Sequence, residues 1–273
     1  LILAAEFATA EKINFMVREA RGLVCLSLTA QQIAQLQLPQ MVKEDQNLSP
    51  NKTAFTVSIE ASSGISTGIS AQDRAHTVLV ASNPYAKPSD ILTPGHIFPI
   101  RAQDGGVLKR AGHTEASVDL ARMSGLNPAA VICEVMNDDG TMARTPELIE
   151  FAKKHNIKIG TIVDLIAYRL QNETLIEEMA HAQLPNHFGD DFKVKVFRSL
   201  VDGAEHLALI KGEVTSERPS LVRVHSECMT GDVFGSLRCD CGPQLQAAMK
   251  KINQEGEGVF LPFPVLSQDF AFV

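Results

Sequence analysis

Three cysteines near the end of the sequence constrain its local fold more than any other feature. Cys228 is followed by Cys239-Asp240-Cys241, directly before a predicted helix over residues 242–253. The chain has 5 cysteines, an odd number that favours metal ligation in a reducing compartment over a disulfide framework. Three thiolates with an open fourth position are typical of catalytic zinc, and a helix N-terminus stabilises thiolates. The sequence therefore predicts a zinc site at the start of this helix.

Two other interpretations of these cysteines stay open. A structural zinc site would be closed by a fourth ligand, for which His225 is the nearest candidate. Alternatively, the three residues are free thiols without a metal.

Size and charge limit the class of partner. A chain of 273 residues with 45% hydrophobic residues is large enough for two domains. The net charge of −7 argues against general attachment to nucleic acid or to an acidic membrane, so a phosphate-bearing substrate needs a local cationic pocket. No apolar run approaches the roughly 18 residues of a membrane helix. We expect a cytoplasmic protein with small-molecule substrates.

Hydrophobic periodicity predicts intermixed helices and strands, and hence an α+β class with a layered, mixed sheet. Predicted helices begin near Thr9 and Thr29 and cover residues 70–80, 114–124, 145–155 and 242–253. Predicted strands cover residues 1–5, 23–28, 55–59, 97–100, 129–136, 192–197, 207–210 and 221–224. Asp139-Gly140 predicts a turn.

A polar stretch marks the predicted domain boundary. Between about residues 171 and 191 the sequence loses strand character and contains Pro185, Asn186 and Gly189. We therefore expect a first domain over residues 1–172, a linker over 173–191, and a second, β-rich domain over 192–273.

Two histidine-bearing turns and one carboxylate suggest a second site in the first domain. Gly112-His113-Thr114, with Arg110 nearby and a helix following, can form a phosphate cradle from backbone amides, the helix dipole and a cation. The alternative is a structural histidine with Thr114 as helix N-cap. Glu134 on an apolar strand is expected to be buried, with a raised pKa that suits proton transfer, unless it lies exposed at a sheet edge. His96, taken alone, is equally weak evidence for a functional site.

The cysteine segment carries a family resemblance. Arg223 to Cys228, followed by Arg238-Cys239-Asp240-Cys241-Gly242, resembles GTP cyclohydrolase II over residues 192 to about 260. The resemblance implies opening of the GTP imidazole ring with loss of formate and pyrophosphate, and zinc bound by Cys228, Cys239 and Cys241. The residues that it places at the GTP site are Arg223, Val224, His225, Ser226, Glu227 and Gln244.

Residues 1 to about 171 resemble 3,4-dihydroxy-2-butanone 4-phosphate synthase. The motifs that carry this resemblance are Asp73-Arg74, Lys87-Pro88-Ser89-Asp90, Pro94-Gly95-His96, Arg101-Ala102-Gln103, Gly112-His113-Thr114-Glu115-Ala116 and Asn137-Asp138-Asp139-Gly140-Thr141-Met142-Ala143-Arg144. The resemblance implies conversion of ribulose 5-phosphate to 3,4-dihydroxy-2-butanone 4-phosphate and formate with Mg²⁺ or Mn²⁺. It makes His113 a metal ligand and His96 and Glu134 essential for the chemistry. The residues that it places against the substrate are Arg110, Ala111, Gly112, His113, Thr114 and Glu134.

Both ends depart from the family patterns. The synthase family's acidic loop would precede Leu1, and GTP cyclohydrolase II continues through Arg-Gln-Glu-Gly-Arg-Gly, where this sequence has Val259 followed by an apolar, Pro-interrupted segment. We expect a chain truncated at both ends that binds zinc without turning over GTP and releases little formate from ribulose 5-phosphate. We also expect residues 260–266 to make a poor central strand.

The order of the two resemblances matches the bifunctional enzymes of riboflavin biosynthesis, which make both precursors of the vitamin. This family also suggests a homodimer. One alternative is a non-catalytic, zinc-binding pseudo-enzyme or regulatory paralogue. Another is a metal-dependent sugar-phosphate aldolase or isomerase.

Overall fold

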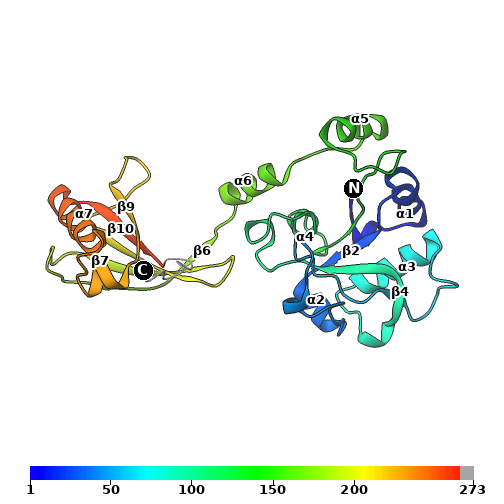
Figure 1. Ribbon diagram of the computed structural model, residues 1–273, viewed down its shortest axis with the longest axis horizontal. Helices are drawn as coiled ribbons and strands as arrows, with labels where there is room; N and C mark the ends of the chain where they lie inside the picture. Colours follow the sequence, from blue (N-terminus) through cyan, green and yellow to red (C-terminus); the bar gives the residue numbers. More distant parts are fainter. Residues whose placement is uncertain (265–273) are drawn as a thin grey trace. The chain divides into compact units, whose positions relative to one another are not determined.

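The computed structural model describes residues 1–264, and its internal contacts divide the chain into two compact units. Unit 1 is Leu1–Glu173 and unit 2 begins at Thr174. Each unit is built on its own sheet of five strands (Figure 1). The predicted α+β class with mixed sheets is therefore confirmed.

The sheet of unit 1 has the order β1-β5-β2-β4-β3. Its strands are β1 (Ile2–Ala4), β2 (Cys25–Leu28), β3 (Ile59–Ala61), β4 (Ile91–Arg101) and β5 (Ala129–Ile132). β2 is central because it pairs in parallel with β4 and antiparallel with β5, so that Cys25 lies opposite both Phe98 and Ile132.

Helices cover both faces of this sheet. The helices of unit 1 are α1 (Ala10–Phe15), α2 (Ala30–Gln35), α3 (Ala71–Ser82), α4 (His113–Met123), α5 (Thr145–His155) and α6 (Ile162–Asn172). Leu26 and Leu28 of β2 belong to one core cluster with residues of α1, α2 and α3. Because side chains alternate along a strand, Cys25 and Ser27 face the opposite side. α4 contacts β1, β2 and β5 without contributing to that cluster, and it covers the second face.

Local capping fixes the starts of the helices, as the sequence predicts. Thr9, Thr29 and Ser70 each accept a hydrogen bond from the backbone N–H three residues later, at distances of 3.0 to 3.3 Å. Such caps satisfy backbone donors that would otherwise lack a partner. α1 continues into a π-helical turn, Met16–Ala20, and then ends at Arg21 in the left-handed region.

α6 lies outside the predicted helices and is held by a buried cation. Arg169 is 5% exposed and donates hydrogen bonds of 2.8 Å to Asp119 on α4 and to the carbonyl of Gly105. Glu173 binds the other side of the guanidinium. The helix therefore depends on partners distant in the sequence, which its own periodicity does not reveal.

Unit 2 contains a sheet in the order β6-β7-β8-β10-β9 and one long helix. The elements are β6 (Ile176–Gln183), β7 (Lys193–Ser199), β8 (Glu205–Lys211), β9 (Val222–Ser226), α7 (Cys241–Glu255) and β10 (Gly258–Phe263). α7 packs on one face of the sheet, where Met249 and Ile252 meet Phe192 and Phe260.

The expected linker over residues 173–191 differs from the structure because it contains β6. β6 pairs antiparallel with β7 at the edge of the sheet, and all its residues are exposed. An edge strand with both faces in water needs no apolar alternation, so its sequence lacks the signal of a strand.

The prediction that residues 260–266 form a poor central strand is confirmed in part within the described residues: a strand forms there, but beyond Phe260 it pairs with β9 alone. β10 lies between β8 and β9, whereas residues 265 and 266 fall outside the described residues. On the β9 side, the Val259 N–H donates to the Leu221 carbonyl and the Phe263 carbonyl accepts from the Glu227 N–H. Because backbone groups alternate along a strand, the nitrogen of Pro262 faces the other side. There β8 pairs only as far as Phe260, and the missing N–H of the proline breaks no pairing.

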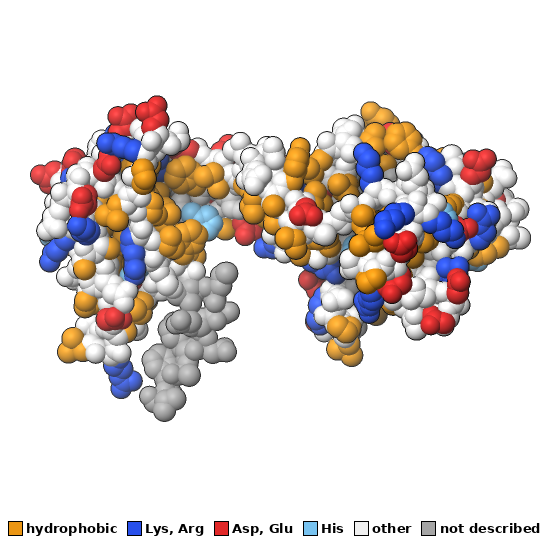
Figure 2. Space-filling view, turned by 90° about the horizontal axis from the view of Figure 1, so that it is seen from above, with side chains coloured by type: hydrophobic (Ala, Val, Ile, Leu, Met, Phe, Trp, Pro, Cys, Tyr) orange, Lys and Arg blue, Asp and Glu red, His pale blue; other side chains and the backbone are white. Residues whose placement is uncertain are grey.

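The surface has mixed charge. On the face shown in Figure 2, Lys and Arg side chains are scattered among Asp and Glu rather than gathered into one basic area. Every helix in residues 1–264 is too short or too polar to span a membrane.

Candidate functional sites

The three predicted zinc ligands come together in unit 2. The sulfur atoms of Cys228, Cys239 and Cys241 all lie within 4.8 Å of one another. Cys228 follows β9 and caps a π-helical turn, Met229–Val233, whereas Cys241 is the first residue of α7. The end of β9 and the start of α7 therefore meet at the cluster, as the sequence predicts.

Gly231 leaves room for this cluster. A Cβ atom at this position would lie 2.7 Å from the sulfur of Cys239 and 2.9 Å from the Cβ of Cys241. The backbone N–H of Gly231 also points to the sulfur of Cys228, at 3.4 Å. The three sulfurs thus surround a cradle that any side chain at residue 231 would fill, and the set suits zinc, which prefers thiolate ligands.

The surroundings of the cluster favour a thiolate at Cys228. Hydrogen bonds from the Thr230 hydroxyl and from the Gly231 backbone lower the pKa of the Cys228 thiol to about 7. Sharing hydrogen bonds with the other two sulfurs raises the pKa of Cys241 to about 12. One negative charge is therefore easily placed on the metal-free cluster, whereas further ionisation requires a cation.

His225 does not belong to the sulfur cluster, although it is the nearest candidate in the sequence for a fourth ligand. Its Nε2 atom lies 2.9 Å from Oδ2 of Asp232, and the residue is 2% exposed. Within residues 1–264, the sets of clustered metal-binding side chains include no histidine. The geometry favours three ligands with an open position over a closed structural site.

The other residues expected at the GTP site divide between two faces of β9. Arg223 and His225 point to the covered face, whereas Val224 and Ser226 are exposed on the opposite one. The Arg223 guanidinium donates to the side-chain oxygen of Gln244 at 2.7 Å, and the amide of Gln244 donates to Asp240 at 2.7 Å. Arg223 and Gln244 are thus brought together beside the cysteines.

Glu227, which is also expected at the GTP site, continues the chain beyond β9. Its backbone N–H donates to the carbonyl of Phe263 at 2.9 Å.

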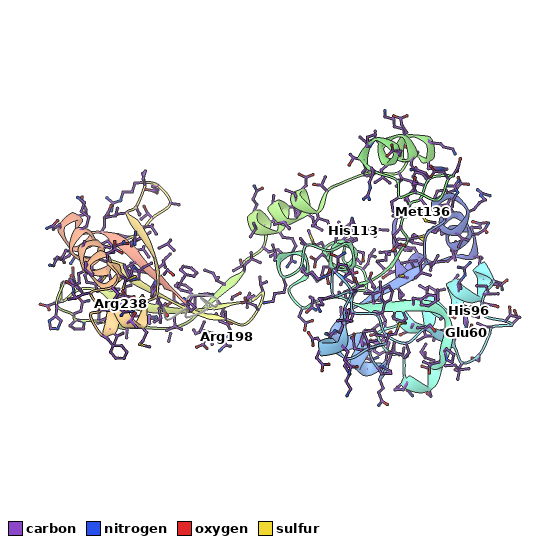
Figure 3. The ribbon with its side chains drawn as sticks, viewed as in Figure 1. Glu60, His96, His113, Met136, Arg198 and Arg238 are labelled. Carbon is purple, nitrogen blue, oxygen red and sulfur yellow. The ribbon has the colours of Figure 1, made fainter. Side chains whose placement is uncertain are left out.

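In unit 1, His96 is paired with a carboxylate that sequence reasoning missed. The Nδ1 atom of His96 on β4 hydrogen-bonds Oε1 of Glu60 on β3. Figure 3 shows this pair together, with His113 lying apart from it at the start of α4. The two partners lie 36 positions apart in the sequence, so only the pairing of β3 with β4 brings them together.

A glycine-containing loop packs against Glu60. A Cβ atom at Gly68, which has a φ of +81°, would overlap the Glu60 carboxylate, and one at Gly95 would overlap the backbone of Ile59. The loop is anchored by Asp73, which accepts hydrogen bonds from the Ser66 hydroxyl at 2.8 Å and the Gly68 N–H at 3.0 Å. These bonds, led by that of Ser66, lower the pKa of Asp73.

The expectation that Glu134 is buried on a strand is wrong. β5 ends at Ile132, and Glu134 is exposed two residues later, where its carboxylate accepts a hydrogen bond from the backbone N–H of Leu23 at 3.2 Å. The apolar run that suggested burial extends beyond the end of β5, and Glu134 lies in the part that follows the strand. Glu134 and His96 nevertheless lie near the same end of the sheet, each two residues beyond a partner of Cys25.

The expected phosphate cradle lies at the start of α4. Gly112 is the N-cap residue, which excludes Thr114 from that role, and Thr114 is buried. Arg110 donates to the carboxylate of Glu115 at 2.6 Å, and Glu115 is 1% exposed. A Cβ atom at Gly112 would lie 2.2 Å from the Arg110 guanidinium, so the absence of a side chain there lets the turn close.

Ala111 and His113 are both exposed in this turn. Among the described residues, no hydrogen bond joins His113 to His96 or Glu134. The histidines therefore stand on separate elements, β4 and α4.

Comparisons with known families divide the chain in the same way. Residues 1–168 match the family of 3,4-dihydroxy-2-butanone 4-phosphate synthase, and residues 177–264 match the family of GTP cyclohydrolase II. The second match includes β6 and β10, and so extends beyond the expected range at both ends.

Whole-chain relatives share both parts. The riboflavin biosynthesis protein RibBA of Aquifex aeolicus is 57% identical over 263 residues, a range that covers 96% of this chain and 64% of that protein. The chain thus spans less than two thirds of that relative's length. A crystal structure of RibBX, a two-domain 3,4-dihydroxy-2-butanone 4-phosphate synthase from A. baumannii, is 42% identical with a TM-score of 0.78, covering 99% of this chain and 75% of that one.

A structure of 3,4-dihydroxy-2-butanone 4-phosphate synthase in complex with two magnesium ions resembles a smaller part. It is 43% identical with a TM-score of 0.60, covering 63% of this chain and 84% of that one.

Proposed function

The chain belongs to the 3,4-dihydroxy-2-butanone 4-phosphate synthase family, and from that premise we propose that unit 1 binds ribulose 5-phosphate and converts it to 3,4-dihydroxy-2-butanone 4-phosphate and formate. Unit 2 is proposed to hold zinc and GTP in the manner of GTP cyclohydrolase II. Both reactions supply riboflavin biosynthesis, the process named for the relatives of the whole chain.

The pairing of His96 with Glu60 carries the proposal for unit 1. A carboxylate that accepts the Nδ1 proton leaves Nε2 of a neutral imidazole as a proton acceptor. Enolisation of a sugar phosphate requires removal of a proton beside a carbonyl, and a histidine held in one tautomer is suited to this step. Glu134, at the same end of the sheet, is proposed as a second proton-transfer group.

Arg110, Ala111, Gly112, His113 and Thr114 are proposed to bind the substrate at the N-terminus of α4. Arg110 donates to Glu115 and to the carbonyl of Asn51, and its guanidinium has further N–H donors for a phosphate. The free backbone amides and the dipole of an N-terminus that begins with Gly112 and His113 also favour an anion.

His113 is proposed as a ligand of Mg²⁺ or Mn²⁺. A divalent ion would neutralise negative charge that develops on the enediolate. In the described part of the chain, however, the cysteine cluster is the only group of three or more metal-binding side chains close enough to share an ion. His113 alone does not make a magnesium site.

Zinc fits unit 2 because three sulfurs surround the space beside Gly231. Cys228, Cys239 and Cys241 would hold the ion, which would supply Lewis acidity for attack on the imidazole ring of GTP. The proposed nucleotide-binding residues are Arg223, Val224, His225, Ser226, Glu227 and Gln244. Of these, Arg223 and Gln244 have the strongest geometric support, since they form one hydrogen-bonded pair.

The comparisons do not support a non-catalytic pseudo-enzyme, because one relative is named as a riboflavin biosynthesis protein and the other as a synthase. We propose small-molecule substrates for both units and a homodimeric assembly. A reducing, cytoplasmic setting suits thiols that bind metal.

Formate release from ribulose 5-phosphate with Mg²⁺ tests the synthase proposal through its dependence on His96. General acid–base catalysis contributes about 10² to 10⁴ in rate, so His96→Asn should lower the rate of this chain by a factor in that range. His187→Asn, an exposed histidine of unit 2, is the matched control. Equal rates for wild type and His96→Asn, or neither formate release nor saturable substrate binding by the folded wild type, would contradict the proposal.

A further inference from the structure

We propose that Asp232 is a positioning residue of the cysteine site, which holds Cys228 in place and keeps His225 away from the metal. This inference rests on the proposed zinc site. It adds a residue whose role requires no contact with a thiolate sulfur or with the substrate.

Asp232 is joined to Cys228 through the backbone in both directions. Its Oδ2 atom accepts a hydrogen bond from the backbone N–H of Cys228 at 2.8 Å, and its own N–H donates to the carbonyl of Cys228 at 2.7 Å. The π-helical turn, Met229–Val233, is thereby closed on the cysteine. Because rotation of the Cys228 backbone moves its sulfur, these two bonds determine where the first thiolate lies.

The same carboxylate oxygen determines the orientation of His225. Oδ2 of Asp232 lies 2.9 Å from Nε2 of His225, and the histidine side chain is 3% exposed. The ring also packs against Phe260, with centroids 5.4 Å apart. An ionised carboxylate has no proton to donate, so Nε2 carries the proton and points to Asp232.

This arrangement explains how an imidazole so near the cysteines is kept from ligating the metal. A histidine binds zinc through a nitrogen without a proton. Nε2 is hydrogen-bonded to Asp232, and the proton-free Nδ1 is buried and does not belong, among the described residues, to the group of ligand atoms that the three sulfurs form. Asp232 therefore preserves three sulfur ligands with an open position, as a catalytic site requires, and links the zinc site to β9.

The main test compares Asp232→Asn with Asp190→Asn, which neutralises an exposed aspartate of the same unit. The asparagine keeps the size of Asp232 and one acceptor oxygen, but it removes the negative charge from the two hydrogen bonds that Oδ2 accepts and places an NH2 group where the buried Oδ1 has no partner among the described residues. Loss of hydrogen-bonded support beyond the ligands typically costs about 10- to 100-fold in metal affinity. We expect this loss for Asp232→Asn, and none for Asp190→Asn, in a competition titration of Zn²⁺ against a chromophoric chelator.

Two readouts separate positioning from a general effect on folding. The absorption spectrum of the Co²⁺-loaded chain reports the ligand set, and it should change in Asp232→Asn but not in Asp190→Asn. In ¹⁵N NMR of the wild type, which needs no variant to fold, His225 should be protonated at Nε2 both without metal and with Zn²⁺.

The outcomes distinguish this inference from the proposed zinc site. A wild type that fails to bind Zn²⁺ would overturn the site itself. Tight binding by the wild type with unchanged affinity and Co²⁺ spectrum in Asp232→Asn would overturn the role of Asp232 alone. A wild-type His225 with a bare Nε2, or one that changes tautomer when Zn²⁺ binds, would also overturn that role.

Discussion

At the scale of single residues, both proposed sites contain a histidine whose ring is oriented by a carboxylate. Glu60 binds Nδ1 of His96, and Asp232 binds Nε2 of His225. Glu60 leaves Nε2 of His96 available as a proton acceptor in unit 1, whereas in unit 2 Asp232 holds Nε2 of His225. The roles of the two histidines thus follow from their partners.

Glu60→Gln should impair the proposed synthase reaction without unfolding unit 1. The amide can still meet the imidazole, but it no longer favours a proton on Nδ1, so Nε2 loses part of its ability to accept a proton. We expect a loss in kcat within the factor of about 10² to 10⁴ that acid–base catalysis supplies, with a small change in KM. Steady-state kinetics measures both quantities, and an unchanged kcat would show that Glu60 does not act through His96.

Asp73→Asn tests the loop that packs on Glu60. Because hydrogen bonding lowers the folded-state pKa of Asp73, its contribution to stability is complete above the unfolded-state pKa of about 3.9 and is lost as the pH falls through the folded-state value. We expect the variant to be less stable at pH 7, with the difference from wild type shrinking below about pH 4. Urea unfolding at several pH values measures this, and a difference independent of pH would contradict it.

Motifs could be predicted from the sequence where residue type is itself the signal, but their partners could not. Cys228, Cys239 and Cys241 are recognisable because thiols at this spacing have few other uses. Glu60 and Asp232 are not, since surface carboxylates are common and their importance arises from contacts made only in the fold. Glu134 shows the opposite error, because its apolar neighbours suggested a burial that the end of β5 does not provide.

At the scale of elements, the cysteine site depends on how closely the turn after β9 approaches the start of α7. A Cβ at Gly231 would lie 2.9 Å from the Cβ of Cys241, and a Cβ at Gly242 would lie 2.5 Å from the Gly231 carbonyl. The absence of side chains at these two positions lets two elements supply ligands to one ion.

Gly231→Ala should therefore weaken zinc binding. The added methyl group would lie 2.7 Å from the Cys239 sulfur, and overpacking of this kind typically costs about 1–3 kcal/mol. Since 1.4 kcal/mol is tenfold in affinity, we expect Zn²⁺ to bind about 10- to 100-fold more weakly. Gly160→Ala is a control for the replacement of a glycine, because Gly160 has no positive φ and a Cβ there meets nothing within 4 Å. Equal weakening in both variants would contradict the steric explanation.

The helices with local caps could be predicted almost to the residue, whereas two strands could not. Ser70 caps α3 and Pro146 lies in the first turn of α5, signals that act within a few residues. β6 is an exposed edge strand without apolar alternation, and β10 contains a proline that is tolerated because the pairing of β10 with β8 ends at Phe260. Their positions depend on pairing with distant strands, which periodicity along one segment does not report.

At the scale of the whole molecule, the chain consists of two units with separate cores and separate proposed ligands. The core of unit 1 lies between its sheet and helices α1 to α3, whereas that of unit 2 is formed around Phe192, Met249, Ile252 and Phe260. His96, Glu134 and the start of α4 belong to unit 1, and all three clustered cysteines belong to unit 2. Each ligand should therefore stabilise one unit.

Calorimetric thermal unfolding with each ligand tests this account most directly. A ligand that binds only the folded state stabilises it by about 2.7 kcal/mol at 100 times its Kd. We predict that Zn²⁺ raises the unfolding temperature of one transition, and that ribulose 5-phosphate with Mg²⁺ raises that of the other. When both ligands are present, each transition should shift by the same amount as with its own ligand alone. A single transition raised by both ligands, or transitions that neither ligand moves, would contradict the assignment of one site to each unit.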